Sequence, residues 1–312
     1  MEFERPLAAL EDKLADLAKL DVHTPELDAE IAALTAEVER IRATLYVDLG
    51  PWERVQVARH PDRPKTQDYV AGLFTDVFEM HGDRSYGDDE AIFAGLGTLG
   101  ERRCVVFGHR KGADIKENIR RNFGQPHPEG FRKARRAMEL AGKFGLPVVS
   151  FLDTAGAFPG LEAEERGQAW AIAECLATLS DLPVPVVVVG IGEGGSGGAL
   201  AIGFGDRLIM LENAYYSVIS PEMCALILHK DSDRASETAG CLDLTAPDLV
   251  RHGIADEIVS EPPGGAHVAP DVVVAAVGER VAAALDSLAD LTGEELVERR
   301  YARLRSMGEF TE

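Results

Sequence analysis

From about residue 69 onward, short apolar runs rich in β-branched residues alternate with segments of helical character. The apolar runs are Cys104–Phe107, Val148–Leu152, Val184–Ile191, Leu208–Leu211 and Ile254–Val259. Helices are expected between them at Phe131–Phe144, at Glu164–Ser180, and at Ala225–His229 with its neighbours. Because strands that alternate with helices pack as a sheet covered by helices, this pattern predicts an α/β domain.

The N-terminal part of the chain has a different pattern. Apolar residues recur at heptad-like spacings on two charged segments, and Thr24-Pro25 between them is typical of a helix start. These features predict a helical hairpin over residues 3–46. The hairpin either packs on its own domain or contacts a partner, and the sequence leaves both open.

The chain is therefore expected to have four parts. Residues 1–46 form the hairpin, and residues 47–68, which include Pro61-Asp62-Arg63-Pro64, are predicted to be a linker. Residues 69–262 form the α/β core. Residues 263–312 are expected to add C-terminal helices at Asp271–Leu291 and Glu294–Met307.

Composition excludes several classes of function. A net charge of −21 argues against binding nucleic acid, which favours a basic face. The four cysteines stand alone, without a C-x-x-C pair for zinc or redox chemistry, and suggest a reducing, cytoplasmic setting. Met1–Leu10 is acidic and lacks the apolar run of a signal peptide, and Val184–Ile191 is too short to span a bilayer.

The sharpest local feature is a glycine-rich stretch that follows the valine run. Gly190, Gly192, Gly194, Gly195, Gly197 and Gly198 lie between an expected strand and an expected helix. Glycines let a ligand approach the backbone closely, and the start of a helix has unpaired N–H groups. Such a stretch suits an anion or an oxyanion, unless its glycines serve close packing only.

Three chemistries fit this stretch. Gly192-x-Gly194-x-x-Gly197, with Glu212 further on, matches a dinucleotide-binding pattern, although the helix that follows would be short. Gly194-x-Ser196-x-Gly198 matches a nucleophile elbow, with Asp243 and His252 in a permitted order. The third possibility is an oxyanion hole built from the amides of Gly197 and Gly198, and this motif alone does not decide among the three.

A second glycine-containing loop points to the same part of the fold. Asp153-Thr-Ala-Gly156-Ala157-Phe-Pro-Gly160 also follows a buried strand and precedes a helix. Loops at the ends of two parallel strands could meet at one site, where Gly156 and Ala157 would contribute. We interpret Asp153 as a carboxylate that organises this loop rather than as a catalytic base.

Several motifs, taken together, are far more specific than any glycine pattern. The chain resembles the alpha-subunit family of the bacterial acetyl-CoA carboxylase carboxyltransferase over nearly its whole length. The motifs that carry the resemblance are Lys111-Gly-x-Asp114, Lys116-Glu-x-Ile-Arg120-Arg121-Asn122-Phe123-Gly124, Pro128-Glu-Gly-x-Arg132-Lys133, Ala163-Glu-Glu-Arg-Gly167-Gln168, Gly192–Gly203, Tyr216-Ser217-Val-Ile-Ser220-Pro221-Glu222, Gly264-Gly-Ala-His267 and Arg299-Arg300-Tyr301. Ala155 and Phe158 depart from the family, which usually has proline and tyrosine there.

The resemblance implies a crotonase-like fold, a spiral of ββα turns. It also implies an α2β2 assembly, active only with a beta subunit that carries a zinc ribbon and most of the acetyl-CoA site. No metal is expected on this chain. The other implied partners are a biotin carboxyl carrier protein, which bears the biotin, and a biotin carboxylase. A stand-alone crotonase-type acyl-CoA hydratase or isomerase is the alternative.

The implied reaction moves a carboxyl group from carboxybiotin to acetyl-CoA and gives malonyl-CoA for fatty acid synthesis. By similarity, Gly197 and Gly198 hold the biotin carbonyl oxygen, Gly156 and Ala157 belong to the second loop, and Gly194 and Gly195 contact substrate.

One basic segment has two interpretations. Residues 110–143 contain ten Lys or Arg against four Asp or Glu. The segment is either a solvated face with local ion pairs, or a contact for coenzyme A phosphates, an acidic carrier protein or nucleic acid. We favour the coenzyme A phosphates, with Arg120 and Arg121 as substrate-binding candidates.

Overall fold

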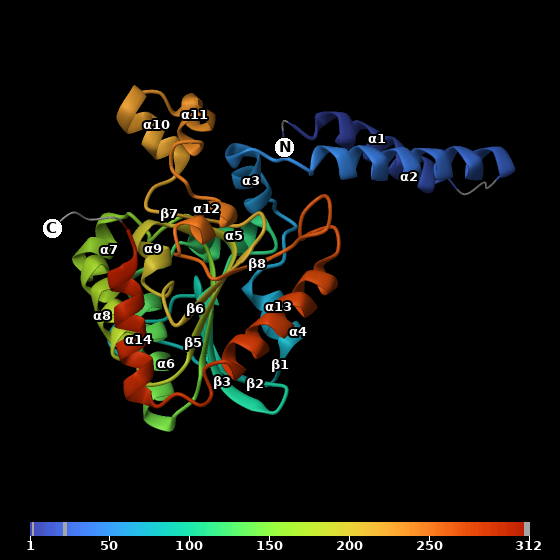
Figure 1. The fold of residues 1–312 in the computed structure, drawn as a ribbon. Coiled ribbons are helices and arrows are strands. Elements are labelled where there is room, and N and C mark those ends of the chain that lie inside the picture. The colour runs from blue at the N-terminus through green and yellow to red at the C-terminus, as the bar shows by residue number, and fades with distance from the viewer. Residues whose placement is uncertain (2, 21–23, 309–312) are drawn as a thin grey trace.

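The computed structural model describes residues 1, 3–20 and 24–308; the remaining residues, which fall within the predicted hairpin and C-terminal segments, lie outside the described part. One eight-stranded sheet forms the centre, in the order β1-β2-β3-β4-β5-β6-β8, with β7 paired to the end of β5 (Figure 1). The strands are β1 Phe74–Glu79, β2 Ile92–Leu99, β3 Arg102–His109, β4 Val148–Thr154, β5 Val186–Gly195, β6 Arg207–Leu211, β7 Tyr215–Ser217 and β8 Glu257–Val259.

The first three strands are antiparallel and the rest of the sheet is parallel. The central strands β4 and β5 are buried along their whole length, which explains why they are uninterrupted apolar runs. All five predicted strands are present in part, whereas β1, β2 and β7 were not predicted. The carboxyl ends of β4 and β5 lie at the same edge of the sheet, where the two glycine segments meet.

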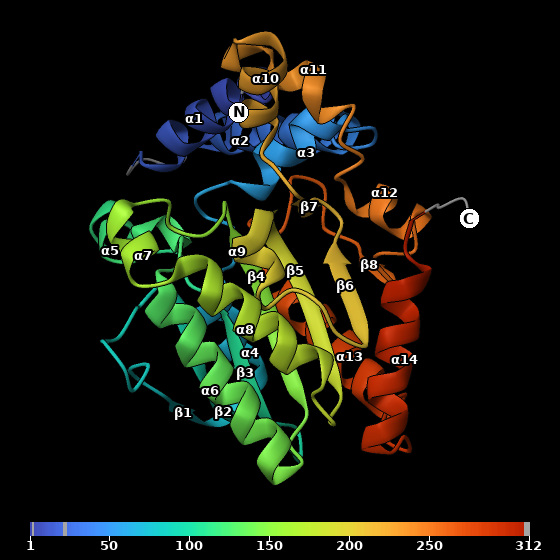
Figure 2. The same ribbon diagram turned by 90° about the vertical axis from the view of Figure 1, so that its left-hand side faces the viewer.

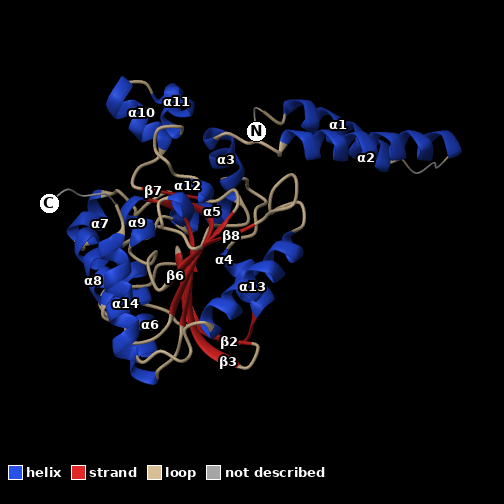
Figure 3. Ribbon diagram, in the orientation of Figure 1, coloured by secondary structure: helices blue, strands red, loops and turns tan. Residues whose placement is uncertain are grey.

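Helices cover both faces of the sheet, and the fold class is α/β as predicted. In Figures 1 and 3, α6 Pro128–Phe144, α8 Gln168–Ser180 and α14 Gly293–Ser306 lie on one face, and α4 Thr66–Leu73 and α13 Pro270–Asp286 lie on the other. Apolar side chains of these helices join those of the sheet in one core. Between the strands lie the shorter helices α5 Ile115–Arg120, α7 Leu161–Glu165, α9 Ser196–Leu200, α10 Pro221–His229, α11 Ala235–Ala239 and α12 Ala246–Arg251, with 3₁₀ turns at Asn122–Gly124 and Ser232–Arg234.

The N-terminal helices α1 Arg5–Ala18 and α2 Pro25–Leu45 form the predicted antiparallel pair. Glu11 of α1 pairs with Arg42 of α2 at 2.5 Å, and Thr24 caps α2 through the N–H of Leu27. Figures 1 and 2 show this pair extending away from the sheet, on the side where the parallel strands end. The pair α10 and α11 also projects there.

The expected linker over residues 47–68 is instead structured. It contains helix α3, Pro51–Ala58, and the first residues of α4, and it buries Val55, Val57 and Arg63. The Arg63 guanidinium donates to Glu261 and to the carbonyl of Ile191, so the proline-rich segment lies against the sheet end. The prolines stop helices here without freeing the chain from the core, which is why the prediction was wrong.

Candidate functional site

The glycine-rich stretch is not a loop, because β5 runs directly into α9. Gly194 pairs with Thr154 of β4 and with Tyr216 of β7. A Cβ atom on Gly195 would overlap the carbonyl oxygen of Ala155. Gly194 and Gly195 therefore allow three strand ends to approach one another closely.

The two strand-end segments meet at Gly198. A Cβ atom on Gly198 would overlap the backbone nitrogen of Ala157 and the carbonyl carbon of Gly156. Gly156 has a φ of 155°, in a region that favours glycine. The structure thus brings together the three candidates Gly156, Ala157 and Gly198.

Helix α9 presents backbone N–H groups beside this contact. The N–H groups in the first turn of a helix have no intrahelical partner, and Ser196, Gly197 and Gly198 form that turn here. A Cβ atom on Gly197 would be 3.7 Å from its nearest neighbour, the Ile172 side chain, which is an ordinary van der Waals distance, so no neighbour crowds this glycine. Ser196 has a φ of 52°, which is uncommon for a residue other than glycine.

A cavity of about 340 Å³ opens beside α9. Ser196 and Gly197 form one wall, and most of the rest is apolar, with Phe204, Val218 and Leu304 among its lining residues. One of the candidate oxyanion donors therefore borders a space large enough for part of a small ligand.

A buried charge network lies behind the same strand ends. Lys111 donates to Asp153 at the end of β4, at 2.8 Å, and to Glu193 in β5, at 2.7 Å. Arg59 at the end of α3 also pairs with Glu193, at 2.7 Å, and Tyr215 donates to the same carboxylate at 2.8 Å. The network joins β4, β5, β7, the end of α3 and the segment after β3. It was missed in the sequence although Lys111 and Glu193 lie inside the quoted motifs.

The network keeps Glu193 and Lys111 charged. Burial raises the pKa of Glu193, but Lys111 and Arg59 outweigh it and hold that pKa at about 2. Burial opposes the charge on Lys111, yet Asp153 and Glu193 keep its pKa above the usual range. Asp153 also accepts a hydrogen bond from the Glu193 N–H at 3.1 Å, as expected for a carboxylate that organises its loop.

A second, more polar cavity of about 580 Å³ adjoins this network. Its lining includes Arg59, Lys111, Asp153, Ala155 and Glu193. The polar cavity borders the end of β4, and the apolar cavity borders α9. Each of the two glycine segments that meet at Gly198 therefore has a cavity beside it.

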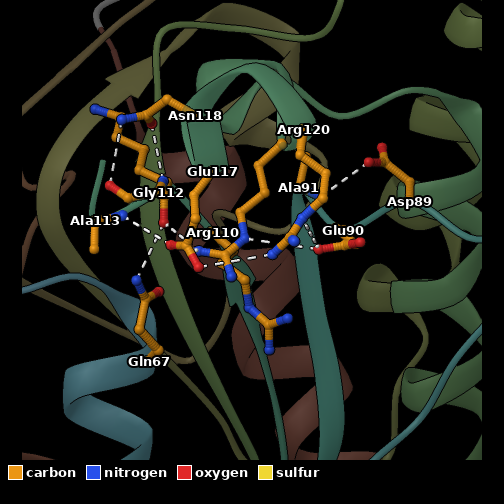
Figure 4. Close-up of polar contacts among 12 residues, drawn as sticks. Gln67, Asp89, Glu90, Ala91, Arg110, Gly112, Ala113, Glu117, Asn118 and Arg120 are labelled. Atoms are coloured by element: carbon orange, nitrogen blue, oxygen red, sulfur yellow. Dashed lines mark hydrogen bonds and ion pairs between the residues drawn. The ribbon is translucent and has the colours of Figure 1, made fainter. Parts of the chain in front are cut away.

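Arg120 and Arg121 lie in a cluster with Arg110, part of which Figure 4 shows. Arg120 pairs with Glu90 at 2.8 Å, and its side chain is 54% exposed. Arg121 is buried, and it donates to Glu117 at 3.1 Å and to the Lys111 carbonyl at 3.0 Å. The two arginines are therefore not equivalent, and only Arg120 presents its charge to solvent.

Most other cations of residues 110–143 pair with carboxylates. The ion pairs are Arg110–Glu79, Arg132–Asp83, Lys133–Asp88, and Arg135 with Glu139 and Glu174. Much of the excess positive charge is thus neutralised by acidic residues elsewhere in the chain, which agrees with the interpretation as local ion pairs.

The hydrolase and dinucleotide interpretations gain no geometric support. Asp243 and His252 do bond to each other, at 2.8 Å, but both side chains are about half exposed, and within the described residues no hydrogen bond joins His252 to Ser196. Helix α9 has only five residues, too few for a dinucleotide-binding crossover. Glu212, the acidic residue of the dinucleotide pattern, instead accepts a hydrogen bond from the Glu261 N–H.

Across residues 1, 3–20 and 24–308, no group of three or more His, Cys, Asp or Glu side chains is arranged to hold a metal ion. None of the helices described is both long and apolar enough to cross a bilayer.

The fold is that of crotonase-type carboxyltransferases and their relatives. The structure superimposes on transcarboxylase 12S with a TM-score of 0.58 at 18% identity, covering 73% of this chain and 42% of that longer one. A chain of the Pseudomonas malonate decarboxylase hetero-dimer gives a TM-score of 0.57 at 16% identity, covering 70% of this chain and 89% of that chain. At these identities the similarity shows the fold alone.

Sequence comparison is more specific. Residues 1–308 match the family model described as acetyl co-enzyme A carboxylase carboxyltransferase-like. The acetyl-coenzyme A carboxylase carboxyl transferase subunit alpha of Rubrobacter xylanophilus is 51% identical, over 99% of this chain and 97% of its own length. The protein of that name from Thermus thermophilus is 50% identical, over 100% and 99%. The chain belongs to this family of carboxyltransferase alpha subunits, and the hydratase alternative is not favoured.

Proposed function

We propose that this chain forms one half of a carboxyltransferase that moves a carboxyl group from carboxybiotin to acetyl-CoA and gives malonyl-CoA. Family membership along nearly the whole chain supports the reaction. The single observation that supports a direct role for this chain is the contact of Gly198 with Gly156 and Ala157, beside Gly197 and the cavity that it borders.

The backbone at this contact suits an oxygen atom that gains negative charge. Carboxybiotin, when bound, supplies the carboxyl group, and the amides of Gly197 and Gly198 would hold the carbonyl oxygen of its ring. A preorganised donor of this kind is worth about 2.7–4 kcal/mol in a shielded site. Gly156 and Ala157 keep Gly198 in place, and Gly194 and Gly195 act indirectly, by letting β4 and β7 approach β5.

The remaining components of the reaction belong to partners. A beta subunit, in an α2β2 complex, would supply most of the acetyl-CoA site and the zinc ribbon. A biotin carboxyl carrier protein and a biotin carboxylase would deliver the carboxyl group, and the whole system is expected in the cytoplasm. In such an assembly the hairpin of α1 and α2, which projects away from the sheet, is available to a partner.

The test is malonyl-CoA-dependent carboxylation of free biotin, measured with this chain alone and then with its beta subunit. Activity is expected only in the mixture. A verified complex of the two subunits with no activity would contradict the proposal. Hydration of an enoyl-CoA by this chain alone would support the hydratase alternative instead.

A further inference from the structure

His109 is the last residue of β3, and its imidazole is fully buried. The ring reaches across β4 towards the helix that follows β5. Its Nε2 atom lies 3.1 Å from the carbonyl oxygen of Gly198, and its Nδ1 atom lies 3.4 Å from the backbone nitrogen of Asp153. One side chain from β3 therefore contacts both strand-end segments of the candidate site.

The partners of the ring define its protonation state. A carbonyl oxygen can only accept, so Nε2 must carry a proton and donate it to Gly198. Burial lowers the pKa of His109 to about 3, so the ring is neutral at physiological pH. Nδ1 then has a free lone pair, which accepts the N–H of Asp153.

The Gly198 carbonyl needs this donor because α9 is so short. In a longer helix the N–H of Ile202 would bond to Gly198, but here it bonds to Ala199 at 3.3 Å. His109 supplies the hydrogen bond to the Gly198 carbonyl that Ile202 does not make. The Cα of Gly198 also lies close to the backbone of Gly156 and Ala157, so the residue is held both at its Cα and at its carbonyl.

We propose that His109 is a positioning residue for the carboxyltransferase, which holds the Gly198–Ala199 peptide through its carbonyl and thereby keeps the N–H of Gly198, on the preceding peptide, in the orientation that its oxyanion role requires. The inference rests on the function proposed above and adds a residue to it. His109 does not border either cavity described above, so its effect on catalysis passes through Gly198 and the end of β4.

The experiment compares His109→Leu, which removes both hydrogen bonds, with His109→Gln, whose amide N–H can replace Nε2–H. Ser150→Ala is the matched control, because Ser150 is equally buried and donates to Ile202 just beyond α9, at 2.7 Å. The malonyl-CoA-dependent carboxylation of free biotin is measured in complexes with the beta subunit whose assembly and Tm are verified.

We expect His109→Leu to lower kcat about 10- to 100-fold with KM for malonyl-CoA unchanged within threefold, because small misplacement of a catalytic group costs about that much. His109→Gln should recover kcat to within a few-fold of wild type, and Ser150→Ala should leave it unaltered. Full kcat in an assembled His109→Leu complex would overturn the inference about His109 but would leave the proposed function intact. Equal losses in the Leu and Gln variants that follow a lowered Tm would also overturn it, whereas an inactive wild-type complex would remove the proposed function as well.

Discussion

At the scale of single residues, the glycines of this stretch differ in how much space surrounds them. Gly198 has backbone atoms of Gly156 and Ala157 where a side chain would begin, whereas Gly87, in an outer loop, has nothing within 4 Å. Gly198→Ala must therefore shift one strand end against the other, while Gly87→Ala meets no obstacle.

We expect Gly198→Ala to lower carboxyl transfer at least 100-fold, which is the effect of losing one oxyanion donor. Gly87→Ala should retain wild-type activity. Both variants are assayed in verified complexes with the beta subunit. Near-normal transfer by Gly198→Ala would show that this peptide does not contact the reacting oxygen.

The buried imidazole of His109 also leads to a prediction about how the stability of the isolated chain depends on pH. The folded protein keeps this imidazole neutral down to a pKa of about 3, whereas the unfolded chain binds its proton below the ordinary pKa of 6.5. The unfolded state therefore binds more protons between these values, and the free energy of unfolding falls as the pH drops from 6.5 towards 3. The loss due to this residue approaches about 1.4 kcal/mol per pH unit.

Urea unfolding of the wild type and of His109→Leu at several pH values between 7.5 and 5 measures this loss. The wild type should lose more free energy of unfolding than the variant as the pH falls below 6.5. The other histidines cancel in the comparison because both proteins carry them. Parallel pH profiles would show that His109 is accessible to protons in the folded state.

Arg120 tests the contact with coenzyme A. Its guanidinium is half exposed and pairs with Glu90 and Glu117, both of which are partly exposed, so a phosphate could compete for it. Arg120→Gln should raise the KM for acetyl-CoA about tenfold, the value of one charge-assisted hydrogen bond, with little change in kcat. The exposed neighbour Lys116, changed to Gln, is the control. An unchanged KM for acetyl-CoA would favour the other interpretation of residues 110–143, a solvated face with local ion pairs.

At the scale of elements, a fully buried cation strengthens the attachment of α14 to the core. The guanidinium of Arg300 donates to the carbonyl oxygens of Leu179, Leu182 and Val184 and pairs with Asp206 at 2.8 Å. It therefore contacts the C-terminal end of α8 and the segments that precede β5 and β6. The side chain has no exposed surface. A C-terminal helix that looks peripheral in the sequence is therefore part of the core.

Arg300→Met should lower the free energy of unfolding by about 3–5 kcal/mol, because Asp206 would remain buried without its partner. Arg299→Met, at an exposed neighbouring position, should change it by no more than about 0.5 kcal/mol. Urea unfolding of the two variants measures the difference. Similar values for both would mean that Asp206 finds other partners or becomes hydrated.

The elements that could be predicted are those with strong local patterns. The apolar runs of β4 and β5 predicted buried strands because they are short and rich in β-branched or aromatic residues. Strands β1 and β2 were not predicted: β2 contains Gly95 and Gly97, which make room for the Phe78 backbone and the Phe74 side chain of β1, and glycine is rare in strands. The helix break at Gly167, with a φ of 82°, was missed because its neighbours are good helix formers.

The candidate site was predictable in its glycines but not in its charges. Gly156 and Gly198 follow strand ends, so parallel topology alone suggested that they could meet. Lys111 and Arg59 are 52 positions apart and reach Glu193 only through tertiary packing, which local sequence does not encode. Arg121 looked equivalent to Arg120 because the sequence does not show that α5 ends at Arg120 and that Arg121, the next residue, is buried.

At the scale of the whole molecule, one core holds the sheet together with its covering helices, and two helical units project from the edge where the parallel strands end. The pair α10 and α11 exposes Met223, Ile227 and Leu228, while α1 and α2 bury little more than Leu7 and Val38. Both units lie on the side of the candidate site (Figures 1 and 2). This arrangement suits a chain whose site is completed by another subunit.

The projecting hairpin of α1 and α2 also changes how the molecule moves through water. A rod attached to a compact body increases friction far more than it increases mass, so the isolated chain should sediment slowly and elute early from a sizing column. An elution volume calibrated with globular standards would then suggest a dimer where light scattering gives the mass of one chain. Stoichiometry of the assembled enzyme should accordingly be determined by methods that do not depend on shape.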